Sequence, residues 1–481
     1  MGPVSDLSDA RSAPRWPLLF VHPEPDHRVR VLASSLKPGE ILSLSSTSGR
    51  LAAVVLTTVL ALAGSLLAAV PAQAANRVTP GNFTGFGFDQ CLAPDQEAMD
   101  AWLTTSRFWA VGIYIAGINR YCDEQPNLDA TWVTTQLRNG WRLLPITVGR
   151  QASCSDNPRY KGKRISGRPA NGYAAARGQG RIAANTTVRR AKKLGISPRS
   201  TLWYDLEHYT GGARCRDSGL SFLSAWTNRL HKLGYRSGVY SSGSSGIRDL
   251  DDARTFTPGK YAMPDQLWIA DWNGKANVAS AYVRPQNWMP HARVHQYRGD
   301  HDERHGGVTI NIDSNYLDVG RGSVAPREIR HCGGVKYNYP RYRRLERGDN
   351  KAQVKTAQCI LRKKGLRSGP LRFHFSGRTQ RAVKSFQTSR RLPVTGKMNP
   401  RTWTVLLAEG KTPVLKIGSA SRHVRRAQRA LNAATGVGLP VTGLFDRATT
   451  KAVRAYQKNR HLPRTGVIAD NTWAPLQRGR R

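Results

Sequence analysis

Eight short apolar segments lie between residues 83 and 317, and they constrain the fold of this 481-residue chain more than any other feature. Apolar runs of this length are typical of strands that are buried on both faces of a parallel sheet. Helical patterns separate several of them, and two of these patterns end in cations and a glycine, at Gly195 and Gly234, as helix C-termini often do. The predicted strands cover residues 83–89, 110–116, 142–148, 201–206, 237–241, 266–272, 293–297 and 309–317.

Strand–helix units repeated over residues 76–320 predict an α/β fold, a (β/α)8 TIM-like barrel. An open, doubly wound sheet is the alternative, but no GxGxxG motif follows the first predicted strand. A barrel of this kind carries its chemistry at the C-terminal ends of its strands, so functional side chains are expected there.

Acidic residues occupy several of these strand ends. The fourth predicted strand runs into Asp205-Leu-Glu207, and alternate side chains of a strand share a face, so both carboxylates point the same way. Asp89 ends the first predicted strand, and Asp313 lies in the eighth. A salt-bridged strand end is the alternative interpretation of Asp-x-Glu alone, but acids on several strands favour one shared site.

Aromatic and amide side chains accompany the acids. A sugar site needs one acid to protonate the leaving oxygen, another carboxylate near the oxocarbenium-like centre, and aromatic faces that stack on pyranose rings. No cofactor or metal is predicted, because two histidines flanked by acids in residues 299–306 are more typical of a solvated loop or a substrate contact than of a metal site. The predicted substrate-binding residues are Tyr114, Asp271, Trp272, Gln296 and Tyr297.

Residues 83–320 resemble the glycoside-hydrolase-like domain of secreted cell-wall proteins of Gram-positive bacteria, which is itself similar to the family-25 lysozymes. The resemblance implies catalytic residues: Glu207 as the general acid, and Asp205 as the residue that positions an acetamido group whose carbonyl acts as internal nucleophile. Asp89 and Asp313 would line the same subsite. The segments that carry the resemblance are Gly85–Asp89, Gly112–Ile115, Tyr204–Glu207, Ser237–Ser241, Trp268–Trp272, His295–Tyr297 and Asn311–Asn315.

After a predicted linker at residues 321–344, the sequence repeats itself with a constant offset of 70 residues, which indicates a duplication. Apolar spacing within each unit predicts small amphipathic helices, hence two all-α three-helix domains at residues 345–409 and 413–478. Each unit resembles the peptidoglycan-binding domain of bacterial wall hydrolases, although Phe375-Ser-Gly377 departs from the usual pattern. The recurring pairs include Val354/Val424, Gln358/Gln428, Phe375/Phe445, Ala382/Ala452, Gln387/Gln457 and Trp403/Trp473.

Residues 1–75 are interpreted as a leader. Residues 51–70 are apolar and uncharged, and a small-x-small pattern precedes a predicted cleavage near Ala74, which favours a signal peptide; an uncleaved membrane anchor is the alternative. Export makes disulfides the expected state of the six cysteines. Six cysteines allow 15 pairings, and the nearest-neighbour guess is Cys91–Cys122, Cys154–Cys215 and Cys332–Cys359.

Charge indicates the partner. The net charge is +42, and residues 333–481 hold 34 lysines and arginines against 5 aspartates and glutamates. A region with this much positive charge is expected to bind a polyanion. Because an exported protein does not meet nucleic acid in the cytoplasm, we expect peptidoglycan and anionic wall polymers as partners of a secreted or wall-associated monomer, with no nucleic acid, and a membrane only through an uncleaved anchor.

The sequence therefore predicts a secreted glycoside hydrolase that cleaves peptidoglycan glycan strands, as lysozymes do, while two C-terminal domains hold it on the wall. The alternative is a non-catalytic wall-binding or scaffold protein on a glycosidase fold, because a fold by itself does not give a function.

Overall fold

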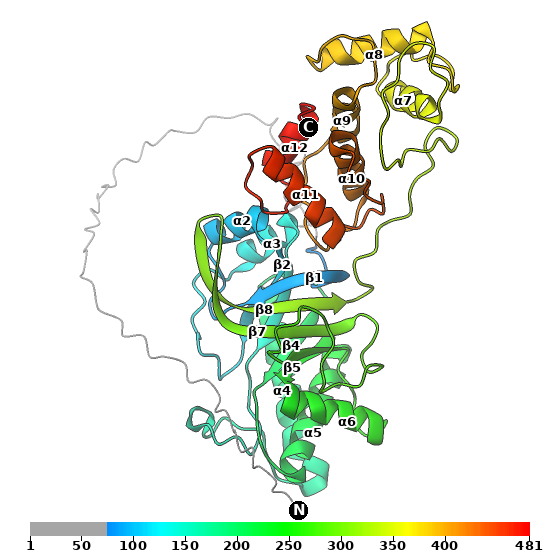
Figure 1. Ribbon diagram of the computed structural model, residues 1–481. Helices are drawn as coiled ribbons and strands as arrows, with labels where there is room; N and C mark the ends of the chain where they lie inside the picture. The colour runs from blue at the N-terminus through cyan, green and yellow to red at the C-terminus, as the bar shows by residue number, and fades with distance from the viewer. Residues whose placement is uncertain (1–74) are drawn as a thin grey trace, which may run out of the picture. The chain divides into compact units, whose positions relative to one another are not determined.

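A closed eight-stranded barrel, in the strand order β1 to β8, forms the first folded part of the chain (Figure 1). The computed structural model describes residues 75–481, so the predicted leader lies outside the described residues. Within that range no helix is both long and apolar enough to cross a bilayer. The strands are β1 (Phe83–Asp89), β2 (Phe108–Ala116), β3 (Arg142–Thr147), β4 (Thr201–Leu206), β5 (Arg236–Ser242), β6 (Gln266–Ala270), β7 (Ala292–His305) and β8 (Val308–Val319).

The TIM-like closure agrees with the prediction, but the direction of the last strand does not. Strands β1 to β7 pair in parallel, whereas β8 is antiparallel to both β7 and β1. The reason is the connection: β7 and β8 are joined by Gly306 and Gly307 alone, both with positive φ, and a two-residue turn can join only antiparallel strands. Residues 299–305, predicted as a loop, belong to β7.

The hairpin of β7 and β8 extends beyond the barrel and packs on the first helix, α2 (Figure 1). The indole of Trp102 on α2 donates to the carbonyl of Val308 at 3.1 Å and meets the ring of His305 edge-on. This hairpin fixes where β8 enters the barrel, and with it the position of the acid on that strand.

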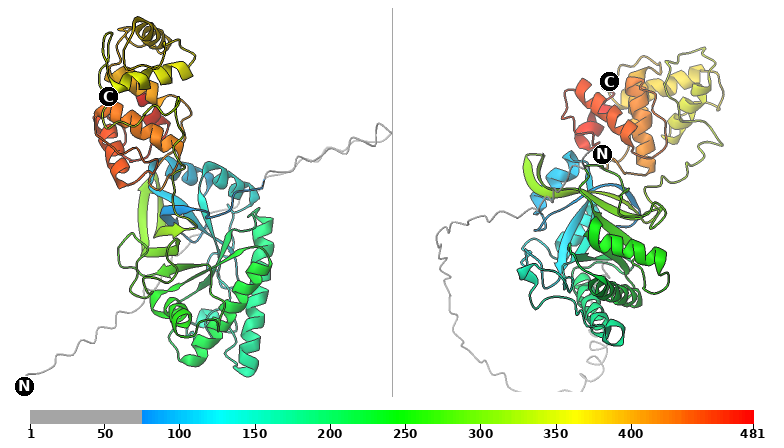
Figure 2. Two further views of the ribbon diagram at one scale, coloured as in Figure 1. Left: turned by 90° about the vertical axis from the view of Figure 1, so that its right-hand side faces the viewer. Right: turned by 60° about the horizontal axis from the view of Figure 1, so that its bottom comes forward.

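Helices surround the parallel part of the barrel, and the two longest, α4 and α5, pack side by side on its outer surface (Figure 2). Two short helical turns, η1 at residues 158–160 and η2 at residues 243–247, lie in the connections. The helices are α2 (Gln96–Thr105), α3 (Ala130–Asn139), α4 (Ala170–Lys193), α5 (Ala213–Lys232) and α6 (Arg248–Phe256).

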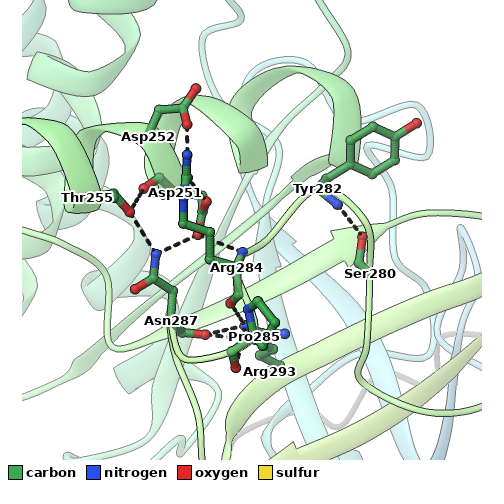
Figure 3. A network of polar contacts seen from close by, with 9 residues as sticks. All are labelled: Asp251, Asp252, Thr255, Ser280, Tyr282, Arg284, Pro285, Asn287 and Arg293. Atoms are coloured by element: carbon green, nitrogen blue, oxygen red, sulfur yellow. Dashed lines mark hydrogen bonds and ion pairs between the residues drawn. The ribbon is translucent and has the colours of Figure 1, made fainter.

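The connection from β6 to β7 contains no helix, and a polar network holds it in place instead (Figure 3). Asp251 on α6 is buried and accepts from the Arg284 side chain and, at 2.7 Å, from the Asn287 amide. Arg293 at the start of β7 donates to the Asn287 carbonyl at 2.9 Å. Polar and charged contacts therefore hold the β6–β7 connection against the barrel, whereas apolar helix faces pack against the strands elsewhere.

Aromatic side chains fill the barrel interior. Trp203 on β4 and Trp268 on β6 are both fully buried, and their rings meet edge to face with centroids 5.5 Å apart. Since Asp205 follows Trp203 by two residues, it shares the inward face one layer higher. The two tryptophans thus form an apolar floor beneath the acids.

Three disulfides cross-link the described residues in the nearest-neighbour pattern. Cys91–Cys122 ties the loop after β1 to the loop after β2, and Cys154–Cys215 ties the loop after β3 to α5. Cys332–Cys359 ties the segment after the barrel to the first helix of the repeat. The first two bridges restrain loops at the C-terminal ends of the parallel strands, where the acids are found.

Two three-helix domains follow, and their helices recur at nearly the same positions in each repeat. Gln358 donates to the Thr379 hydroxyl at 3.0 Å, and Gln428 donates to Thr449 at 3.1 Å. The repeated tryptophans are fully buried, as Trp403 shows, so they serve the cores. The helices are α7 (Ala352–Lys363), α8 (Gly377–Ser389) and α9 (Pro400–Ala408), then α10 (Arg422–Thr435), α11 (Arg447–Asn459) and α12 (Asp470–Gln477).

Candidate active site

Three strands bring four carboxyl groups to one end of the barrel. Asp89 is the last residue of β1 and lies directly opposite Asp313 of β8. Asp205 lies in β4, and Glu207 follows the end of that strand. Because β8 runs against β1, Asp313 reaches this end although it lies in the first half of its strand. The four acids that the sequence singled out therefore belong to one cluster.

Asp89 is 3% exposed and has donors on three sides. The Asn315 amide donates to it at 2.5 Å, the Gln296 amide at 3.3 Å, and the Tyr114 hydroxyl at 3.4 Å. Burial raises the pKa of Asp89 well above its usual value, repulsion from Asp313 adds to this, and the three donors oppose it. Burial and Asp313 therefore favour the protonated form of the Asp89 carboxyl, and the three donors favour its ionised form.

Room for Asp89 depends on a glycine of β2. A side chain at Gly112 would place its first carbon 2.5 Å from the Asp89 β-carbon, which is closer than two carbons approach. The Gly-Ile-Tyr-Ile segment that carried part of the family resemblance therefore has a steric reason to begin with glycine.

Asp205 has a buried carboxyl oxygen that bonds to no other described residue. It is 3% exposed, and its Oδ1 atom has no hydrogen-bond partner among the described residues. A buried polar atom without a partner costs free energy, and Asp205 Oδ1 is one of several such atoms among the described residues, but it is the one that belongs to the acid cluster. Burial raises the pKa of Asp205 well above its usual value, and repulsion from Glu207 and then Asp89 adds to the rise.

Glu207 is partly exposed, and its backbone is fixed by a residue that the sequence did not reveal. The Gln151 side chain accepts from the Glu207 backbone N–H at 2.8 Å and donates to the Asp205 carbonyl at 2.9 Å. Gln151 is almost fully buried and therefore clamps the end of β4. Burial, followed by repulsion from Asp313, raises the pKa of the Glu207 carboxyl.

Asp313 completes the cluster from the hairpin side. The backbone N–H of Asp300 donates to one of its oxygens at 2.6 Å, and the Gln296 amide donates to the other at 3.2 Å. Burial raises the pKa of Asp313 to about 6, against the effect of the Asp300 N–H. Burial thus shifts the pKa of all four acids toward the range in which a carboxyl can serve as a general acid.

The structure separates the five residues that were predicted to bind substrate. Tyr114 and Gln296 contact the acids directly, and Trp272 stands half-exposed at the rim with its indole bonded to Gln296. Asp271 lies at the rim as well, but its carboxylate accepts from Ser280 and Asn273 of its own loop. Tyr297 points the other way and is buried in the core between strands and helices, because neighbouring side chains of β7 face opposite sides.

Three further residues belong to the site. The Gln151 amide bonds to the backbone of Glu207, and the Asn315 amide donates to the Asp89 carboxyl. Tyr240 of β5 donates to the Gln296 amide oxygen at 3.1 Å. Alternation along β5 could have identified Tyr240 as inward-facing, whereas nothing local marks Gln151. Within residues 75–481 no group of histidines, cysteines and acids is arranged to hold a metal ion.

Comparison with known families gives two matches. Residues 100–317 match the Rv2525c-like, glycoside hydrolase-like domain, and residues 350–406 and 421–476 each match the peptidoglycan binding domain family. No curated protein matches the chain.

Solved structures with similar chains include three of bacterial origin. They are an uncharacterized B. stearothermophilus protein (19% identity, 48% of this chain and 95% of that chain, TM-score 0.31), the Mycobacterium tuberculosis Tat-secreted protein Rv2525c with L-tartrate (11%, 49% and 95%, 0.34), and the Clostridium perfringens spore cortex lytic enzyme SleM (14%, 49% and 67%, 0.33). TM-scores this low support no inference about activity.

Proposed function

Since the chain carries a Rv2525c-like, glycoside hydrolase-like domain and two peptidoglycan binding domains, we propose that it is an exported cell-wall hydrolase that cleaves the glycan strands of peptidoglycan. The barrel would carry out the hydrolysis, and the C-terminal domains would hold the enzyme on the wall. Its place of action would be the extracellular face of the cell or the wall itself.

One observation carries this proposal: carboxyl groups from β1, β4 and β8 meet at one end of the barrel, and burial raises the pKa of every one of them. A protonated carboxyl can give its proton to a glycosidic oxygen, while an ionised neighbour favours positive charge at the sugar carbon. The unpartnered Oδ1 of Asp205 supports a further ligand contact at this position.

In the proposed mechanism, Glu207 donates its proton to the glycosidic oxygen as the bond between that oxygen and the anomeric carbon breaks. The unpartnered oxygen of Asp205 accepts from the N–H of the substrate acetamido group and orients its carbonyl toward the anomeric carbon. The carbonyl oxygen bonds to the anomeric carbon as the leaving alcohol departs, and water then displaces it from that carbon and gives a proton to Glu207. Asp89 and Asp313 would stabilise the developing positive charge.

The C-terminal domains would raise the local substrate concentration without changing the chemistry of the barrel. Their repeated glutamines and tryptophans are used in the two cores, so we expect contact with the wall through exposed side chains, which in residues 333–481 are strongly cationic. Phosphate-bearing wall polymers would add to the affinity for the glycan.

The test is the release of reducing ends from purified cell walls by the whole protein and by Glu207→Gln and Asp205→Asn. Both substitutions keep side-chain size, and Asp217→Asn, which alters a surface acid paired with Arg216, is the matched control. We expect loss of release in both site variants and full release in the control. No release by the wild-type protein would favour a wall-binding scaffold, and equal release by all variants would remove these acids from the mechanism.

A further inference from the structure

Gln296 on β7 joins the aromatic rim to the acid cluster through hydrogen bonds to Trp272, Asp89 and Asp313. Its amide nitrogen donates to Asp89 at 3.3 Å and to Asp313 at 3.2 Å. Its amide oxygen accepts from the Trp272 indole at 2.9 Å and from the Tyr240 hydroxyl at 3.1 Å. The residue is 1% exposed, so its bonding capacity is used within the protein rather than offered to a substrate.

The orientation of this amide follows from its partners. An indole N–H can only donate, so the group facing Trp272 must be the amide oxygen, and the amide nitrogen must then face the acids. A protonated carboxyl would instead favour the amide oxygen, because its O–H is a donor. Because the indole keeps the amide oxygen turned away from the acids, a protonated carboxyl has no acceptor in Gln296, and the ionised form of both acids is favoured.

The same arrangement occurs a second time in the site, with one difference. Asn315 donates to Asp89, and its amide oxygen accepts from the indole of Trp268 at 2.7 Å. Trp268 is fully buried, whereas Trp272 is 51% exposed and its ring packs against the backbone of Gly299. Only the Trp272 contact lies where a solvent or a ligand can reach it.

We propose that Trp272 is a positioning residue for Asp89 and Asp313: its indole N–H locks the Gln296 amide in the orientation that donates to both acids and favours their ionised forms against the effect of burial. This role is separate from the sugar stacking expected of a rim aromatic. It rests on the proposed function only for its catalytic consequence, because the lock itself is a property of the unliganded protein.

Other ionisable groups face the same pair and set the background against which the lock acts. They repel the charge on the acids or donate to it, and a substitution at Trp272 leaves all of them in place. They are Tyr114 on β2, Asp205 and Glu207 on and after β4, Tyr240 on β5 and Asp300 on β7.

The test compares the wild-type protein with Trp272→Phe, which keeps an aromatic ring but removes the N–H together with the five-membered part of the indole. The midpoints of Asp89 and Asp313 are followed by carboxyl carbon NMR on protein labelled at aspartate, and Asp89→Asn and Asp313→Asn assign the signals. We expect both midpoints to rise in Trp272→Phe by about half a pH unit to one unit, as for the loss of one neutral hydrogen bond. Gln296→Leu, which removes both donors, should raise them further.

Tyr121→Phe is the matched control, because this exposed aromatic in the loop after β2 has no hydrogen bond to Gln296 in the described structure. Its midpoints should equal those of the wild-type protein. In wall hydrolysis, Trp272→Phe should shift the acidic limb of the kcat profile upward by the same amount, whereas a loss of stacking alone would raise KM without moving that limb.

Unchanged midpoints in Trp272→Phe overturn the lock, whatever the activity. Raised midpoints in a protein that releases no reducing ends leave the lock standing and remove the proposed hydrolysis instead. If Trp272→Phe failed to fold, Gln296→Leu would be titrated in its place, because it removes the amide that donates to both acids, and unchanged midpoints there would also overturn the lock.

Discussion

Asp89 and Asp313 face each other across β1 and β8, at the two ends of the barrel sequence, and both are held by the amide of Gln296. Like charges directly opposite in a sheet are unfavourable. The barrel tolerates this pair because donors surround it and because a proton can occupy it, as the raised pKa of Asp89 indicates. We therefore expect these acids to lower the free energy of unfolding at pH values where they are ionised.

Asp313→Asn is therefore expected to stabilise the protein above neutral pH. Folding raises the pKa of Asp313 to about 6, so the ionised form is disfavoured in the folded state, and the wild type loses stability as the pH rises from about 4 to about 6. Asparagine removes this loss. Calorimetry should show a gain of about 1–2 kcal/mol at pH 8 that vanishes near pH 4; a constant gain at all pH values would contradict the charge argument. Asp217→Asn is the control.

Gln151→Leu should lower kcat while the protein remains folded. The side chain holds the end of β4 through the carbonyl of Asp205 and the N–H of Glu207, and leucine fills the same space without either bond. Misplacement of Glu207 by a fraction of an ångström should reduce kcat by about 10- to 100-fold. Reducing-end release under saturating substrate measures this. An unchanged kcat would show that the loop after β4 needs no clamp.

Asp251→Ala should destabilise the barrel strongly. It leaves the buried Asn287 amide with Thr255 alone and Arg284 with Asp252 alone, and it empties the buried space of the carboxylate, at a cost of about 2–4 kcal/mol. Asp252→Ala is the matched control, since this carboxylate pairs with the same arginine but is 44% exposed, and its loss should cost under about 1 kcal/mol. The melting temperature by calorimetry separates the two, and equal losses would show that burial is unimportant here.

Binding to purified walls should weaken with added salt. The surplus of lysine and arginine after residue 333 predicts attraction to phosphate groups, which mobile ions screen. Co-sedimentation of the whole protein should fall several-fold between low and high salt. Walls stripped of phosphate-bearing polymers serve as the control and should show a smaller change. Salt-independent binding to both preparations would restrict recognition to the uncharged parts of the glycan.

The strands were predictable because burial leaves a local mark. Continuous apolar runs located all eight strands, although β7 extends eight residues beyond its predicted end, and the constant offset of the repeat gave two domains whose helices recur in step. The acids at strand ends were also visible, since a charged residue directly after an apolar run is unusual. Each of these signals lies within a few residues of the feature that it reports.

The direction of β8 and the supporting residues were not predictable in the same way. Apolar runs report that a strand is buried but not which way its neighbour runs, so the eighth strand was wrongly taken as parallel. Side-chain amides carry no local signature either. Gln151 became a clamp, and Gln296 a lock, only through partners that lie far away in the chain.

The sequence by itself determined which residues would carry charge and which would be buried, because periodicity and composition record the contact of each segment with water. Tertiary structure alone decided which side chains meet. In the folded protein Tyr297 is buried between the strands and the helices, and the Gln296 amide donates to Asp89 and Asp313. One oxygen of Asp205 has no partner among the described residues. Hydrogen bonds are short and directional, so they depend on where distant strands finally lie.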